Sequence, residues 1–305
     1  MRASLQALTA ELKRLKASGV KSLVVSDESL RQLRLVVAAR KQVAPRAIET
    51  VAPETPAVEI PAPRPAARPF TVKPIDPGAA SVPAPSAFKI PAGEKAARWA
   101  ALREIVLNDA VCRSHVRANK LVVFGVGSVD AKIMFVGEAP GGEEEVQGEP
   151  FVGPAGQLLT KMISGMGLKR SDVYIGNIMN WRPEMPLDAS GVQYGNRPPS
   201  EQEMAYCLPY LKAQIEIVNP DVLVALGSTA TQGLLGFGSF KALGDVRGRW
   251  HEFAGKPLMV TYHPSYILRN QSNRSKRMIW EDLLKVMERV GLPISDKQRG
   301  FFLER

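Results

Sequence analysis

Four short apolar runs, separated by segments with helical periodicity, most strongly constrain the fold of this 305-residue chain. An apolar run of four to six residues fits a strand that is buried on both faces. Strands that alternate with helices pair in parallel through right-handed crossovers. The sequence therefore predicts an α/β domain with a four-stranded parallel sheet, whose strands cover 133–136, 173–178, 222–226 and 258–262.

Helical segments lie between these runs and at both ends of the domain. Ser200 and Glu203 have the spacing of a capping box, which predicts a helix that begins at residue 200. The expected helices cover 96–107, 156–166, 200–218, 229–235 and 275–290.

Proline content divides the chain into three parts. Half of the 24 prolines fall within 43–93, mixed with Ala, Glu and Ser. Such a segment cannot bury enough apolar surface to fold, so we expect an extended, disordered linker. Leucines spaced three and four apart predict a basic helical arm over 1–42, in which two helices would form a hairpin. The main folded domain is expected over 94–305.

The net charge of +10 is concentrated in the expected arm. Residues 1–42 carry nine Lys or Arg and three Asp or Glu, a net charge of +6. This excess favours a polyanionic partner, although the solvated faces of two helices would show the same pattern. We therefore weigh an arm that scans DNA against a hairpin that docks onto a protein partner or self-associates.

Two cysteines do not make a disulfide framework. No apolar run approaches the length of a membrane span, and the first residues do not resemble a secretion signal. We expect a cytoplasmic protein.

Polar or small residues follow each predicted strand. Glu138, Asn177, Ser228 and His263 would meet at one edge of the sheet, where open parallel sheets bind ligands. Each residue also has a structural interpretation: Glu138 as a turn cap, Asn177 as a turn residue and His263 as a core histidine. Their convergence favours an active site.

Longer motifs surround these residues and occur in a characteristic order. They are GEAPG at 137–141, GEPFVG at 148–153, AGQLL at 155–159, Asn177, NRPP at 196–199 and HPSYILR at 263–269. Over about 105–290 the chain resembles the uracil-DNA glycosylase superfamily, most closely the family 4 enzymes. The resemblance implies a three-layer α/β/α sandwich and a monofunctional DNA glycosylase of base-excision repair, which flips uracil out of DNA and hydrolyses its N-glycosidic bond.

The resemblance also implies roles for individual residues. Glu138 would orient or deprotonate the attacking water, and His263 would donate to uracil O2 as negative charge develops. Phe151 would stack on uracil while Asn177 reads its O4 and N3–H edge, and small residues would let the backbone approach the base (Gly137, Ala139 and Gly141). The implied DNA contacts are Ser228, Ser265, Ile267, Leu268 and Arg269.

One departure from family 4 concerns its iron–sulfur cluster, which four cysteines hold. Of those positions this chain keeps Cys112 and Cys207, has Trp181 at a third, and has His115 where the second cysteine of the first pair would stand. An indole is not a cluster ligand. Cys112, His115 and Cys207 would supply three ligands for a zinc ion. Trp181 at the vacated ligand position is better interpreted as apolar filling that replaces the metal. We therefore expect no metal and no cofactor.

Two other functions compete with a uracil-DNA glycosylase. The first is a glycosylase for another deaminated base, such as hypoxanthine or xanthine. The second is a non-catalytic binder of damaged DNA, which would not need the carboxylate of Glu138. The sequence leaves the preference for single- or double-stranded DNA open.

Overall fold

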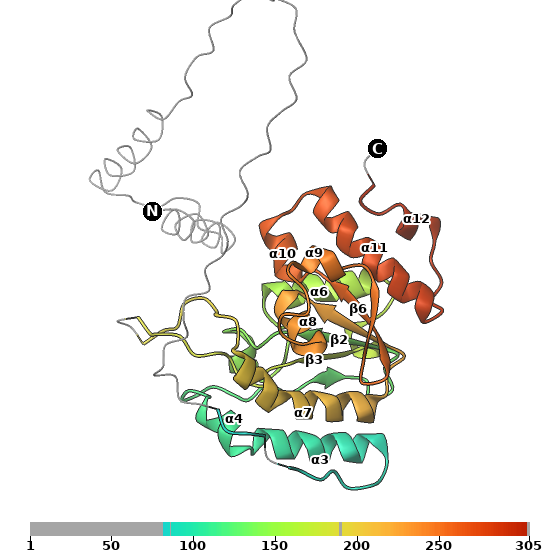
Figure 1. Ribbon diagram of the computed structural model, residues 1–305. Coiled ribbons are helices and arrows are strands. Elements are labelled where there is room, and N and C mark those ends of the chain that lie inside the picture. Colours follow the sequence, from blue (N-terminus) through green and yellow to red (C-terminus); the bar gives the residue numbers. More distant parts are fainter. Residues whose placement is uncertain (1–81, 86, 189–190, 304–305) are drawn as a thin grey trace, which may run out of the picture. The chain divides into compact units, whose positions relative to one another are not determined.

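The computed structural model describes residues 82–85, 87–188 and 191–303, which belong to one folded unit (Figure 1). The expected arm over 1–42 and most of the expected linker over 43–93 lie outside the described residues. Within the described part of the chain, no helix is long and apolar enough to cross a membrane.

The predicted parallel sheet is confirmed, but it has six strands instead of four. The strand order is β1-β3-β2-β4-β6-β5. Four strands pair in parallel at the centre: β2 (Ile133–Gly137), β3 (Tyr174–Asn177), β4 (Val222–Leu226) and β6 (Lys256–Thr261). These are the four predicted strands, with shifts of one or two residues at most of their ends.

Two antiparallel edge strands account for the difference. β1 (Val126–Gly127) has only two residues, and β5 (Trp250–Phe253) is half-exposed, so neither forms the buried apolar run that predicts a central strand. β5 joins β6 in a hairpin whose turn residues, Ala254 and Gly255, both have positive φ. Edge strands of this kind carry little signal in a single sequence.

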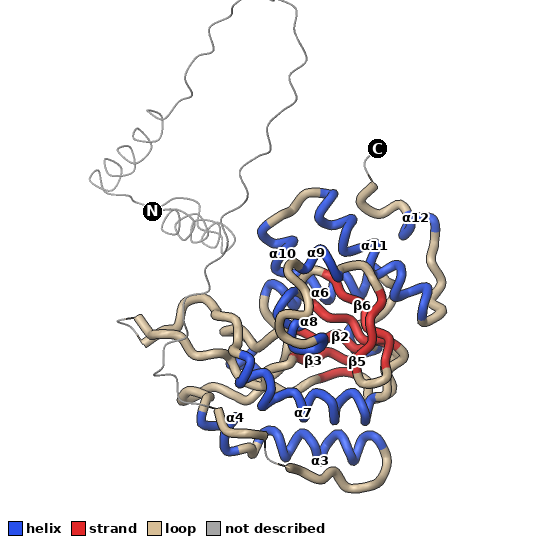
Figure 2. The backbone as a smooth tube through the Cα atoms, in the orientation of Figure 1, coloured by secondary structure: helices blue, strands red, loops and turns tan. Residues whose placement is uncertain are grey.

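Side chains alternate between two separate cores on the two faces of the sheet. Met134 and Val136 pack into one core, while Ile133 and Phe135 of the same strand pack into the other. Helices α3 (Lys95–Leu107) and α7 (Glu201–Val218) cover the first face, and α6 (Pro154–Gly165) and α11 (Asn273–Arg289) cover the second (Figures 1 and 2). The expected three-layer α/β/α sandwich is therefore present.

The helices follow the sequence prediction closely. α7 begins after Ser200, whose hydroxyl accepts from the N–H of Glu203 while the Glu203 carboxylate accepts from the N–H of Ser200. The helix predicted over 229–235 is α8 (Ser228–Leu235). The remaining short elements are α4 (Ala110–Ser114), α5 (Glu144–Gln147), η1 (Arg170–Asp172), α9 (Leu243–Val246), α10 (Pro264–Arg269) and α12 (Asp296–Arg299).

Residues that precede the expected boundary at residue 94 contact the domain. The ring of Phe88 packs at a tilt against Tyr210 of α7 with ring centroids 4.9 Å apart, and Ile90 packs against the same core. The C-terminal end of the proline-rich segment is thus attached to the domain.

Strand order determines where a ligand can bind. The chain leaves β2 toward β3 on one side and then returns to place β4 on the other side of β2. Connections that diverge in this way open a crevice at the carboxyl ends of the two adjacent strands. The crevice lies at β2 and β4, where Glu138 and Ser228 follow.

Candidate active site

A cavity of about 520 Å³ occupies this crevice. It brings together residues that follow four different strands, as the sequence predicted. Of the predicted site residues, those that line it are Glu138, Ala139, Gly141, Phe151, Asn177, Ser228, His263, Ser265 and Arg269.

Gly137 lies beneath this cavity and allows it to form. A Cβ atom at this position would come within 2.5 Å of the Phe151 ring and would also collide with Oδ1 of Asn177. Both residues can therefore close over the end of β2 only because position 137 has no side chain.

Asn177 presents an unpaired acceptor at this edge. Its side chain is 6% exposed, and its Oδ1 has no hydrogen-bond partner within the described protein. A buried amide oxygen without a partner costs free energy, on the order of 1–3 kcal/mol, unless a ligand or water supplies the donor. Asn177 is thus ready to accept a hydrogen bond from a ligand in the cavity.

Phe151 is held in an unfavourable backbone conformation. Its φ is +55°, in the left-handed region that side chains other than glycine rarely adopt. The ring is buried and lies 5.5 Å from the His263 ring, centroid to centroid. Strain of this kind persists where the surroundings hold the residue in place, which is common in binding sites.

The carboxylate of Glu144 ties together the two loops of the site. Its Oε2 accepts from the N–H of Gly141 at 3.1 Å. Its Oε1 accepts from the N–H groups of Val152 and Gly153 at 3.1 and 3.0 Å. The role of Glu144 was not identified from the sequence. Its spacing three residues after Gly141, which is typical of a carboxylate that caps a turn, was the available signal.

His263 is a neutral hydrogen-bond donor toward the cavity. Burial, together with the positive charge of Arg269, lowers its pKa to about 4. Its Nδ1 accepts from the backbone N–H of Ser265 at 3.2 Å and lies 2.8 Å from the Ser265 hydroxyl. Because Nδ1 is an acceptor and the ring is neutral, the proton is on Nε2.

Glu138 follows β2 and is half-buried. Burial raises the pKa of its carboxyl group, while a hydrogen bond with the side chain of Thr229 on α8 opposes the shift. A carboxylate with a raised pKa is a better proton acceptor near neutral pH. Thr229, which also lines the cavity, was not identified from the sequence.

The proposed DNA contacts differ in accessibility. Ser228 and Arg269 are exposed at the mouth of the cavity. On α10, Leu268 is 41% exposed, whereas Ile267 is 6% exposed and packs into the core. Of the two residues considered for filling the base stack, only Leu268 is therefore accessible.

The positions that correspond to the cluster ligands meet in the core that α3 and α7 cover. Cys112, Trp181 and Cys207 are all fully buried there. The side chains of Cys112 and Cys207 form a hydrogen bond which, with burial, raises the pKa of the Cys112 thiol. The indole of Trp181 stacks on His115 with ring centroids 4.8 Å apart. Two thiols that hydrogen-bond to each other, one of them held protonated, and an indole do not fit a cluster that needs four thiolates.

The fold and the site define a doubly wound α/β protein with a polar pocket of about 520 Å³ at its switch point. The family described as the uracil DNA glycosylase superfamily matches residues 124–284. The chain belongs to this superfamily.

Curated relatives narrow the assignment within the superfamily. A type-4 uracil-DNA glycosylase from Thermotoga maritima is 43% identical over 183 residues, which cover 60% of this chain and 89% of that protein. A type-4 enzyme from Pyrobaculum aerophilum is 39% identical, with 57% and 87% covered. A type-5 enzyme from the same organism is 29% identical, with 54% and 73% covered. The predicted resemblance to the type-4 enzymes is confirmed.

Glu144→Gln tests the link between the two loops. One amide oxygen can accept, but the amide NH2 cannot replace the second carboxylate oxygen, so the loops lose part of their attachment. We expect kcat/KM for uracil excision to fall by about 100-fold, the scale on which a small misplacement acts. The matched control is Glu143→Gln, which changes an exposed neighbour whose side chain makes no cap hydrogen bond. Equal activity of both variants would contradict the assignment.

The lowered pKa of His263 predicts a loss of stability in acid. The folded state has a pKa of about 4 and the unfolded chain about 6.5, so unfolding takes up a proton between these values. This contribution is fully present above pH 6.5 and is lost as pH falls toward 4, with a slope of up to about 1.4 kcal/mol per pH unit. Urea denaturation at a series of pH values measures the free energy of unfolding. This free energy should fall less steeply with decreasing pH for His263→Asn than for the wild type. An identical slope in the variant would show that His263 is not the group responsible.

Proposed function

We propose that this chain is a uracil-DNA glycosylase that excises uracil from DNA by hydrolysis, leaves an abasic site and works without an iron–sulfur cluster. The observation that carries the proposal is the unpaired Oδ1 of Asn177 beside the Phe151 ring. An acceptor next to an aromatic face suits a flat base with a ring N–H. The type-4 relatives, which are uracil-DNA glycosylases by name, support the substrate.

Base recognition follows from the two faces of the amide. Oδ1 of Asn177 accepts from uracil N3–H, and its Nδ2 donates to uracil O4, while Phe151 stacks on the ring. Cytosine presents an acceptor at N3 and a donor at its exocyclic amine, so both pairs would be mismatched inside a buried site.

Bond cleavage uses two groups that line the cavity, Glu138 and His263. Water attacks C1′ of the sugar as the C1′–N1 bond breaks, and the electron pair of that bond moves to uracil. The carboxylate of Glu138 accepts the proton from water, and its charge favours the positively charged sugar. Nε2–H of His263 donates to uracil O2 and keeps its proton, which matches its low pKa.

Independence from a cluster is supported by the packing at its expected position. Cys112, Trp181 and Cys207 are buried in one continuous core, and the hydrogen-bonded thiols need no ligand to satisfy them. The Trp181–His115 stack links this core to the segment that contains α4. These contacts stabilise the domain in place of metal ligation.

The role of residues 1–42 stays a proposal, since they lie outside the described residues. Their net charge of +6 suits attraction to DNA. Deleting them separates two roles. A DNA-scanning arm predicts a flatter salt dependence of binding, whereas a hairpin for a protein partner or for self-association predicts unchanged activity on naked DNA.

The decisive measurement is cleavage of a uracil-containing oligonucleotide by metal-free protein. We expect abasic sites to form with the wild type. His263→Ala should lower kcat by about 100- to 1,000-fold, the usual loss for one oxyanion donor. Glu138→Ala should lower it by about 100- to 10,000-fold.

Other outcomes would redirect the assignment. Binding without uracil cleavage would contradict the proposal, and hypoxanthine and xanthine substrates would then distinguish a different glycosylase from a non-catalytic binder. Activity that appears only after iron and sulfide are supplied would contradict its cluster-free part.

A further inference from the structure

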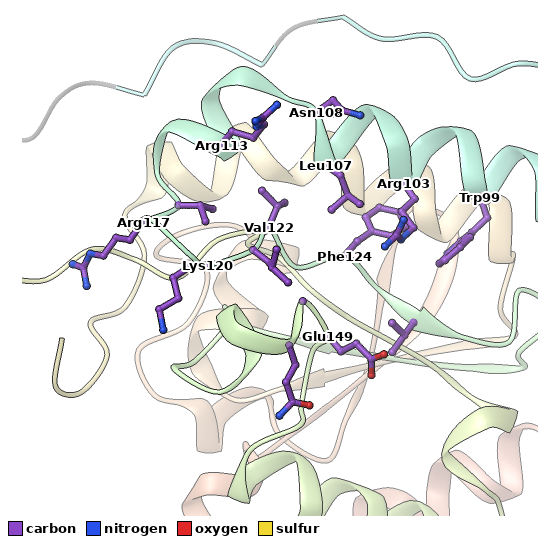
Figure 3. Close-up of a pocket in the computed structure, with 15 residues that line it drawn as sticks. Trp99, Arg103, Leu107, Asn108, Arg113, Arg117, Lys120, Val122, Phe124 and Glu149 are labelled. Atoms are coloured by element: carbon purple, nitrogen blue, oxygen red, sulfur yellow. The ribbon is translucent and has the colours of Figure 1, made fainter. Parts of the chain in front are cut away.

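A second, larger cavity lies beside the candidate active site and has no role in the reaction. Its volume is about 690 Å³. Trp99, Arg103 and Leu107 of α3 form one wall, and Glu149 lies on the opposite wall (Figure 3). The exposed side chain of Leu121 also lines it. We call this cavity the basic groove.

Positive charge is concentrated in the basic groove. Arg103, Arg113, Arg117 and Lys120 line it, against the single carboxylate of Glu149. Residues 96–305 together carry 25 basic and 22 acidic residues, a net charge of only +3. The groove therefore has as much net charge as that whole segment, which makes it a local attractor for anions.

Two of these cations have little to neutralise them. Arg113 makes no ion pair or hydrogen bond through its side chain within the described part of the chain. Among the described residues, the only ion pair of Arg103 is with Glu104, its exposed sequence neighbour, at 3.5 Å. By contrast, Arg117 donates to the carbonyl of Met185 and Lys120 lies 3.7 Å from Glu145. Arg113 and the weakly paired Arg103 are therefore the cations best able to bind a ligand.

One short segment of the chain connects the basic groove to the base pocket. Glu149 lines the groove, and Phe151, two residues later, lines the pocket. Two residues of extended chain span at most about 7 Å, which is the rise of about two stacked nucleotides. A strand with its base in the pocket therefore needs only one or two nucleotides to reach the groove.

Polar contacts beneath this segment also connect residues of the groove with residues of the pocket. Glu145 pairs with Lys120 at the groove and with Arg182 at 2.9 Å. Arg182 in turn donates to Oδ1 of Asn196, which lines the pocket. These contacts connect Lys120, which lines the groove, to Asn196, which lines the pocket.

We propose that the basic groove binds the phosphates of the uracil-bearing DNA strand, on one side of the flipped nucleotide. Cationic side chains beside apolar surface form the usual combination in grooves that follow a single strand. The inference rests on the proposed function only for the identity of that strand. It adds a DNA contact surface at α3 and α4, away from the strand ends that supply the chemistry.

The test compares the salt dependence of binding in two charge-matched variants of the full chain. Arg103→Ala/Arg113→Ala removes these two cations from helices that tolerate alanine well. Lys132→Ala/Lys169→Ala removes the same charge at exposed positions that precede β2 and β3, at the opposite edge of the sheet. Both are made in a Glu138→Ala background for binding, so that the DNA stays intact, and in the wild-type background for cleavage.

We expect the groove variant to bind a long single-stranded uracil oligonucleotide more weakly. The slope of log K against log salt concentration should fall in magnitude by about 1.4, or about 0.7 for each lost phosphate contact. Two further oligonucleotides carry uracil at the 5′ end or at the 3′ end. The one without nucleotides on the groove side should be bound and cleaved equally by the groove variant and its parent. Oligonucleotides extended on only one side of uracil identify the polarity.

Two results would be decisive against the inference. Equal slopes for the groove variant and the charge-matched control would overturn it, as would an equal loss on the oligonucleotides with uracil at the 5′ end and at the 3′ end. Failure of the wild type to cleave uracil would instead count against the proposed function. The salt dependence of DNA binding would still show whether the groove binds phosphates.

Discussion

The missing side chain at Gly137 is the constraint on which the candidate site depends. β2 is buried on both faces and ends at the switch point of the sheet, so there is little space around the residues that follow it. Without a Cβ at residue 137, the Phe151 ring and the Asn177 amide both approach the end of the strand. The pocket therefore depends on the close approach of these two side chains to the backbone of β2. Phe151 adopts a strained φ in this arrangement.

Hydrogen bonding separates residues that hold the site from residues that meet a ligand. Glu144 accepts three backbone N–H groups, and Arg197 forms a bidentate pair with Glu203 at 2.7 and 2.8 Å. Such side chains have used their capacity on the protein. Asn177 keeps an unpaired Oδ1 and His263 turns its Nε2 proton away from its protein partners. Buried polar groups with unused capacity are the ones that recognise a substrate.

The core beside α3 and α7 shows how a family fold can keep its shape when ligand residues change. Trp181 is fully buried in the same core as Cys112 and Cys207, and its ring stacks on His115. The indole N–H has no partner within the described protein, which is the cost of placing a polar heteroaromatic ring there. Apolar contact and stacking hold these segments together.

The sequence by itself determined the central strands, their helices and the edge where Glu138, Asn177 and His263 meet. Buried parallel strands leave continuous apolar runs, and long ordered motifs place residues at their ends. Only the tertiary structure decided what depends on packing between distant segments. It added two edge strands, buried Ile267 while exposing Leu268, assigned the loop bridge to Glu144 and placed a basic groove beside the pocket. Accessibility and pairing arise from which surfaces meet, and a linear pattern does not contain that information.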